Sequence, residues 1–199
     1  METKNTSEKV LIMLLKEPFA RHTATSLANA LKITRQGLWK ILNKLAKDNL
    51  ITLESTGSTQ KSAVNIKVRW ANLVAQKILS ILLTKESLEY ERWGTNFAEF
   101  ENYVSFVILF GSILYSPKEA NDIDILTIVK NKRSFKKLDE VLLKIQKTQI
   151  KKIHFISLTE KEFREELKDK NKVYLEAIKK GVILLGQDNY IKFIRDLLK

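Results

Sequence analysis

The 199-residue sequence contains no cysteine, so disulfide bonds, thiolate metal sites and cysteine nucleophiles are all excluded. It has two histidines, His22 and His154, which are too few for a zinc centre of the usual kind. Low-complexity segments and internal repeats are absent from the sequence as well.

The sequence also lacks an apolar run of the roughly 18 residues that a membrane-spanning helix requires. A basic amphipathic segment with a wide aromatic face, which would favour a membrane surface, is missing too. The first nine residues are polar, and no cleavage-like site of small residues follows the short apolar stretch at residues 10–15. We therefore expect no membrane partner, no signal peptide and a cytoplasmic protein.

The chain has an excess of positive charge, with 35 Lys and Arg residues against 23 Asp and Glu residues and a formal net charge of +12. The excess is denser at the amino end. Residues 1–90 contain 14 Lys or Arg and 7 Asp or Glu, whereas the remaining residues contain 21 and 16. We therefore expect the amino-terminal part to bind a polyanion.

Residues 23–50 have the pattern of two helices joined by a tight turn. Thr34 is a favourable N-cap for the second helix. Its apolar residues Leu38, Ile41, Leu42 and Leu45 follow the i, i+3, i+4, i+7 spacing of a face that packs on a core. The opposite face carries Arg35, Gln36, Trp39, Lys40, Asn43, Lys44 and Lys47.

This polar face has the composition of a DNA recognition helix. Lys and Arg bind phosphates, and Arg, Gln and Asn bind base edges. We predict that Arg35, Gln36, Trp39, Lys40, Asn43 and Lys44 contact DNA. Trp39 is ambiguous, because a tryptophan on a helix surface can also cover the edge of the core.

A β-hairpin is predicted next, because residues 51–54 and 63–68 alternate in polarity around a polar loop. Its basic tip, Lys61, is a further predicted DNA contact. The order helix, helix-turn-helix, hairpin resembles a winged-helix domain of the kind seen in MarR-like regulators, over about residues 4–69. The resemblance implies double-stranded DNA as the partner. The alternative is a small helical domain whose basic face is simply solvated.

Residues 70–83 form a strongly apolar helical pattern, with a wide stripe at Leu73, Val74, Ile78, Ile81 and Leu82. The stripe packs either within the chain or on a second copy, and the sequence favours neither, so a homodimer is an open alternative. We interpret residues 70–103 as a helical connector between a winged-helix domain at residues 1–69 and a second domain at residues 104–199.

The second domain begins with two predicted buried strands, residues 104–110 and 123–129. Asp122 and Asp124 open the second strand two residues apart, so both point to one face with their side-chain origins ~6.6 Å apart. Two carboxylates in that arrangement can share divalent ions with a triphosphate. Gly111 and Ser112 follow the first strand. A glycine there lets backbone approach a ligand, and we expect a helix beginning at Ser112 to favour an anion.

These features predict a site for Mg²⁺ or Mn²⁺ with a nucleoside triphosphate, with Asp122 and Asp124 as metal ligands and Gly111 and Ser112 at the nucleotide. An Asp-x-Asp without a metal is the plainer alternative. Gly111-Ser112 followed by Asp122-Ile123-Asp124 resembles the signature of the DNA polymerase beta-type nucleotidyltransferase superfamily. Residues 104–199 as a whole are similar to the minimal nucleotidyltransferases of archaea and bacteria.

The sequence departs from that family at three places. Ser116 stands where the family usually has a second glycine, and Asn121 stands where it has a serine. The resemblance also implies a third carboxylate on a neighbouring strand, residues 151–158, which can act as base. The matching position here is His154. Imidazole is a poor ligand for Mg²⁺, so His154 is either a half-buried structural histidine or a base that completes a catalytic set with Asp122 and Asp124.

Further along, helices are predicted at residues 132–147, 174–180 and 190–198, a strand at residues 182–185, and a capping box from Thr159 to Glu162. The predicted fold class is α+β, a winged helix-turn-helix followed by a nucleotidyltransferase-like mixed β-sheet with flanking helices.

We favour a transcriptional regulator whose second domain binds Mg-nucleotide with weak or no activity. The alternative is an active nucleotidyltransferase that moves AMP from ATP to a protein or nucleic acid. The family resemblance adds a third alternative, an antitoxin with a toxin-like protein partner.

Overall fold

The computed structural model describes residues 5–55 and 64–199. The chain divides into two units, Met1–Leu82 and Leu83–Lys199, and the division falls inside helix α4 (Leu73–Leu88). The predicted three-part division, with a separate connector at residues 70–103, stays a prediction. The fold class is α+β, as expected, with helices and two β-sheets in the described part of the chain.

The amino-terminal unit has the winged-helix architecture. Helices α1 (Thr6–Lys16), α2 (Ala24–Leu31) and α3 (Arg35–Lys47) precede the antiparallel strands β1 (Ile51–Ser55) and β2 (Val64–Val68). In the hairpin, Ile51 pairs with Val68 and Ser55 with Val64. The predicted tip residue, Lys61, lies outside the described residues.

Local hydrogen bonds set the helix boundaries of this unit. The Thr23 side chain forms a capping box with Ser26 at the start of α2. Thr34 Oγ1 accepts a hydrogen bond from the Gly37 amide at 3.1 Å, as predicted for the N-cap of α3. Such a cap is typically worth about 1 kcal/mol. Side-chain caps therefore fix the starts of both helices, and the cap at Thr34 also ends the turn between them.

The core of the unit is built from the apolar faces that the periodicity predicted. Leu38, Leu42 and Leu45 of α3 are buried, and Ile41 is half-buried. Burying a leucine side chain contributes roughly 1.5–3 kcal/mol, so this face holds α3 in place. His22 is buried as well, with Nε2 2.9 Å from the Glu17 carbonyl oxygen, and its own carbonyl accepts the Ile66 amide. His22 is therefore a structural residue.

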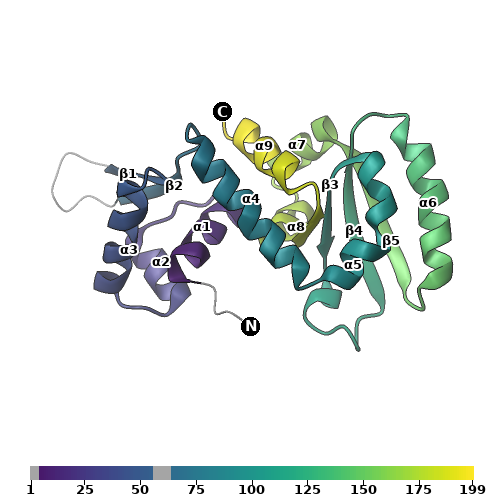
Figure 1. Ribbon diagram of the computed structural model, residues 1–199, viewed down its shortest axis with the longest axis horizontal. Coiled ribbons are helices and arrows are strands. Elements are labelled where there is room, and N and C mark those ends of the chain that lie inside the picture. Colours follow the sequence, from purple (N-terminus) through teal and green to yellow (C-terminus); the bar gives the residue numbers. More distant parts are fainter. Residues whose placement is uncertain (1–4, 56–63) are drawn as a thin grey trace. The chain divides into compact units, whose positions relative to one another are not determined.

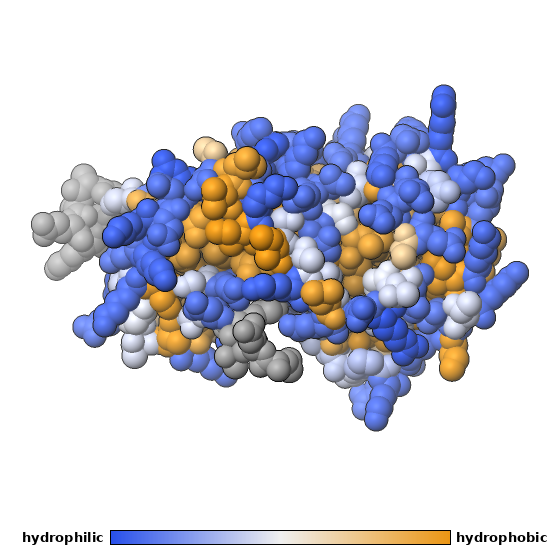
Figure 2. Space-filling view, in the orientation of Figure 1, coloured by the Kyte–Doolittle hydropathy of each residue, from blue (hydrophilic) through white to orange (hydrophobic). Residues whose placement is uncertain are grey.

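The apolar stripe of α4 is divided between two sides of the helix. Leu82 is buried together with Ala75, Leu79 and Leu83. Leu73, Val74 and Ile81 are instead 65%, 60% and 56% exposed. Apolar side chains gather on the surface over α4 (Figure 2). A second copy could cover them, and the homodimer stays a prediction.

The carboxy-terminal unit contains a four-stranded mixed sheet in the order β5-β4-β3-β6. Strands β3 (Val104–Phe110) and β6 (Val182–Leu185) pair antiparallel, and so do β3 and β4 (Asp122–Val129). Strand β5 (Lys152–Thr159) pairs parallel with β4 at the edge of the sheet. The predicted mixed sheet is therefore present, and the strand of His154 lies directly beside the strand of Asp122 and Asp124.

Helices cover both faces of this sheet (Figure 1). One face carries α5 (Glu91–Asn96), the 3₁₀ helix η1 (Ala98–Asn102) and α6 (Ser134–Thr148). The other carries α7 (Glu160–Lys168), α8 (Lys172–Lys180) and α9 (Gln187–Leu197). The core on this second face contains an aromatic cluster. The Phe106 ring lies 5.3 Å from that of Tyr190, and the Phe163 ring lies 5.2 Å from that of Phe193.

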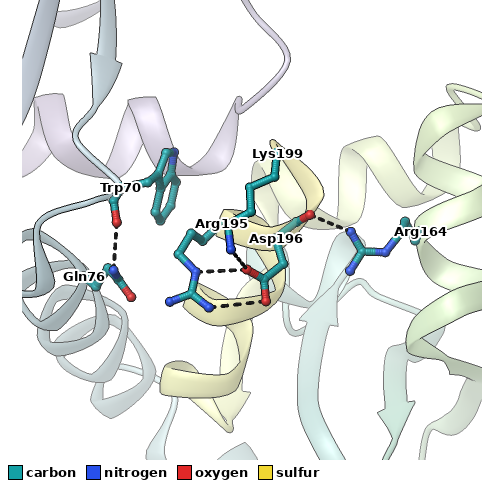
Figure 3. A network of polar contacts seen from close by, with 6 residues as sticks. All are labelled: Trp70, Gln76, Arg164, Arg195, Asp196 and Lys199. Carbon is teal, nitrogen blue, oxygen red and sulfur yellow. Dashed lines mark hydrogen bonds and ion pairs between the residues drawn. The ribbon is translucent and has the colours of Figure 1, made fainter.

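Two polar networks fix helix ends in this unit. The predicted capping box is confirmed, since Glu162 Oε2 accepts from the Thr159 amide at 2.8 Å and Thr159 Oγ1 accepts from the Glu162 amide. At the end of α9, Arg195 and Lys199 donate to the Asp196 carboxylate, and Arg164 donates to its carbonyl oxygen (Figure 3). The hydrogen bonds from Arg195, and then from Lys199, lower the pKa of Asp196 to about 2. The first network fixes the start of α7, and the hydrogen bond from Arg164 joins α7 to α9.

None of the helices within residues 5–55 and 64–199 has the length and apolar character needed to cross a membrane.

Candidate metal and nucleic-acid sites

The polar face of α3 is exposed over its whole length. Arg35, Gln36, Lys40, Asn43, Lys44 and Lys47 are all exposed, and Trp39 is half-buried. The half-burial of Trp39 is compatible with both interpretations of this residue. The structure thus places six of the polar residues singled out from the sequence on one accessible helix surface.

The charged side chains of this surface are all positive. Helix α3 contains no acidic residue, and the first carboxylate after it is Asp48 at its C-cap. Lys44 and Lys47 lie in the last turn, where they also complement the helix dipole. The hairpin that follows is partly neutralised by an ion pair between Lys67 Nζ and Glu54 Oε2 at 2.7 Å. Helix α3 therefore carries four basic side chains with no acidic residue among them.

A second group of polar side chains gathers at one end of the mixed sheet. The parallel pairing of β4 and β5 places Asp124 opposite His154, and His154 Nδ1 lies 3.0 Å from Asp124 Oδ1. Asp122, Asp124 and His154 each offer one ligand atom, and these atoms all lie within 4.8 Å of one another. The three residues predicted as a catalytic set are thus brought together by the sheet.

The imidazole of His154 is accessible. Its side chain is 62% exposed, so the interpretation as a half-buried structural histidine does not hold. A carboxylate only accepts hydrogen bonds, so Nδ1 donates to Asp124 and Nε2 remains as the second ring nitrogen. In this tautomer Nε2 carries the lone pair that a metal ion or a proton requires.

Gly111 lies against the same carboxylate. It has φ +82°, and a Cβ atom built on it would be 2.0 Å from Asp124 Oδ2. A side chain at position 111 would therefore displace Asp124, and the positive φ disfavours any other residue there. The group that the Gly111 backbone lies against is a carboxylate of the candidate metal site, and its approach to a nucleotide stays a prediction.

The helix predicted to begin at Ser112 is not formed, and this expectation was wrong. Only a three-residue 3₁₀ helix, η2 (Ser112–Leu114), follows the glycine, so no α-helix N-terminus is available to bind an anion. Pro117 accounts for the early stop, because proline lacks an amide donor and disfavours helical backbone at the preceding residue, Ser116. Ser112 can contact a nucleotide only through its own hydroxyl and amide.

No family model matches the sequence, and no curated protein matches it. Among solved structures, the chain is similar to the adhesin competence repressor AdcR from Streptococcus pyogenes. The identity is 20%, the match covers 51% of this chain and 70% of the repressor chain, and the TM-score is 0.36. A likeness at this level is too weak to carry a functional assignment, which has to come from the two candidate sites themselves.

Proposed function

We propose that this protein is a transcriptional regulator that binds double-stranded DNA through the polar face of α3. The supporting observation is the exposure of Arg35, Lys40, Lys44 and Lys47 on a capped helix without acidic residues, in a unit with the winged-helix architecture. In a helix-turn-helix the second helix enters the major groove. There Gln36 and Asn43 are of the residue types that bind adenine, and the lysines are of the type that binds phosphates.

The experiment is a titration of duplex DNA by fluorescence anisotropy at several salt concentrations. The Lys40→Glu/Lys44→Glu variant should lose most of its affinity, because two attractions to phosphates become repulsions. The slope of its log-log salt dependence should flatten by about 0.9 for each phosphate that the variant no longer neutralises. Lys144→Glu/Lys147→Glu, which makes the same charge change on exposed positions of α6, is the matched control. Equal losses of DNA affinity in the two variants would show that α3 is only a solvated basic face and not the DNA-binding helix.

The carboxy-terminal unit has a second proposed function, the binding of a nucleoside triphosphate with a divalent metal ion. It is supported by the two carboxylates and one imidazole that converge within 4.8 Å. The two carboxylates suit either Mn²⁺ or Mg²⁺, but the imidazole disfavours Mg²⁺ more, because Mg²⁺ is the harder ion and demands near-ideal octahedral oxygen coordination. Asp122 and Asp124 would hold the ion, and the ion would neutralise the phosphates. His154 would fill a third position through a ring nitrogen.

Because a histidine stands where the family resemblance implies a third carboxylate, we propose that nucleotidyl transfer is weak or absent. The alternative, an active enzyme that transfers AMP, has its own support in the contact between Asp124 and His154. A carboxylate that accepts from Nδ1 orients the ring and fixes the tautomer in which Nε2 carries the lone pair. The toxin-like protein partner rests on the family resemblance alone and stays a prediction.

A further inference from the structure

An open pocket of about 490 Å³ lies beside the carboxylate cluster. Its walls come from the end of β3, from the turn after it, and from α8, and they include Phe110, Gly111, Tyr115, Lys172, Val173 and Lys180. Most of the exposed lining is apolar. The pocket has the size and character of a small-molecule site, with few polar groups on apolar walls.

The pocket and the carboxylate cluster share one face of the sheet. Phe110 pairs with Asp124 across β3 and β4, and Asp124 pairs with His154 across β4 and β5. Paired residues of neighbouring strands project to the same face, so the three side chains form a row. Gly111 belongs to both places, because it lines the pocket and lies against the Asp124 carboxylate. A ligand at Asp122 and Asp124 can therefore reach into the pocket without crossing the sheet.

The lining of the pocket indicates what that part of the ligand is. Tyr115 and Val173 are 65% and 50% exposed, so much of the apolar surface of both side chains is accessible to a ligand. Lys172, Glu176 and Lys180 are the charged residues of the lining, and Lys180 is paired with Glu176 one turn earlier on α8, so Lys172 carries the excess positive charge. Apolar walls with an aromatic side chain suit a flat ring system, and Lys172 suits a ligand that carries negative charge.

We propose that this pocket holds the base of the nucleotide whose phosphates and metal ion bind at Asp122 and Asp124. The inference rests on the proposed nucleotide binding by the carboxy-terminal unit and extends it to the base. The Tyr115 ring provides a surface on which a base stacks, and Val173 of α8 adds an apolar wall to the same pocket. Every base has a π-face, so stacking of this kind favours a base over bare phosphate without choosing strongly among bases.

Calorimetric titration of the full-length protein in Mn²⁺ separates the base from the phosphates. The titrants are ATP, GTP, CTP and UTP, with inorganic tripolyphosphate as the ligand that has no base. The wild type should bind at least one nucleotide about tenfold or more tightly than tripolyphosphate, since that is the usual effect of one stacked base. Tyr115→Ala should lose this advantage while its affinity for tripolyphosphate stays unchanged.

Two further variants sharpen the result. Tyr115→Phe keeps the ring and should bind as the wild type does. Val173→Trp fills the pocket from α8 and should weaken nucleotide binding alone. Both positions are exposed, so folding should be retained, and a thermal melt checks it. The base pocket would be overturned if nucleotides bound no more tightly than tripolyphosphate. It would also be overturned if Tyr115→Ala and Val173→Trp both bound nucleotide as the wild type does. Neither result would contradict the metal site. A wild type that binds neither kind of ligand would overturn both.

Discussion

His154 and Asp124 face each other across the parallel strands β5 and β4, with His154 Nδ1 3.0 Å from Asp124 Oδ1. The pair couples an accessible imidazole to a carboxylate that is only 18% exposed and that packs against the backbone of Gly111. Asp122 stands two residues before Asp124 on the same face. The chemistry available at this end of the sheet is therefore that of two carboxylates with one nitrogen ligand or base.

The first prediction concerns the carboxylates. Asp122→Asn together with Asp124→Asn should abolish metal-dependent nucleotide binding, because neutral amides are much weaker ligands for a divalent ion than carboxylates. Titration calorimetry with Mn-ATP and Mg-ATP measures this. The fold and the affinity for DNA should not change. Asp139→Asn, at an exposed position of α6, is the control and should bind nucleotide normally. If the wild type shows no metal-dependent binding at millimolar nucleotide, the unit has a structural or protein-binding role instead.

The second prediction concerns His154 and separates the regulator from the enzyme. The wild type should bind metal-nucleotide but transfer the nucleotidyl group barely or not at all, and it should prefer Mn²⁺ to Mg²⁺. His154→Asp supplies the missing carboxylate, so it should shift the preference toward Mg²⁺ and create or raise transfer. A general base typically contributes ~10² to 10⁴-fold. Incorporation of labelled AMP into protein or RNA is the measurement.

The opposite result for His154 is equally clear. Strong incorporation of AMP by the wild type that disappears in His154→Ala, while nucleotide binding persists, would identify the imidazole as the base. The active transferase would then be the correct interpretation, and the Asp124 contact would be part of its mechanism.

The third prediction concerns the exposed apolar residues of α4. Leu73, Val74 and Ile81 leave a hydrophobic surface that a second copy of the chain would cover. Light scattering after size exclusion should give about twice the 23.0 kDa of one chain. Val74→Glu/Ile81→Glu should give a folded monomer, since neither side chain is buried in the single chain. Lys77→Glu, on an exposed position of the same helix, controls for the added charge. A monomeric wild type at about 100 µM would argue against the homodimer.

The fourth prediction concerns Tyr190 in the aromatic cluster. Its ring is fully buried, burial raises the pKa of the phenol, and the hydroxyl has no hydrogen-bond partner among the described residues. Burying an unpaired hydroxyl costs free energy, so Tyr190→Phe should leave the free energy of unfolding unchanged or raise it by about 1–2 kcal/mol. Tyr190→Ala should lower it by about 3–5 kcal/mol through the cavity it leaves. Urea unfolding curves distinguish these outcomes. A clear loss of stability in Tyr190→Phe would show that the hydroxyl is hydrogen-bonded in solution.

Much of the local structure could be predicted from short-range signals. The apolar run of β3 ends at Gly111, α3 begins after the Thr34 cap, and the Thr159 capping box starts α7, all as expected. Each of these three boundaries depends on a few neighbouring residues, so a short segment of sequence contains all the information needed to predict it. The expected helix at Ser112 failed although the glycine was correctly interpreted, because the effect of Pro117 on the turn was not taken into account.

The sequence alone determined where most of the strands and helices lie. It also determined that α3 has one basic and one apolar face, and that Asp122 and Asp124 share one face of a strand. These properties follow from periodicity, capping and side-chain chemistry along the chain. Tertiary structure decided which strands are neighbours, and so brought His154 to Asp124 and placed Val173 of α8 beside Phe110 and Tyr115. It also decided which apolar side chains of α4 are buried. Such proximities depend on how separate elements pack, and packing is set by many weak contacts between residues that are distant in the chain.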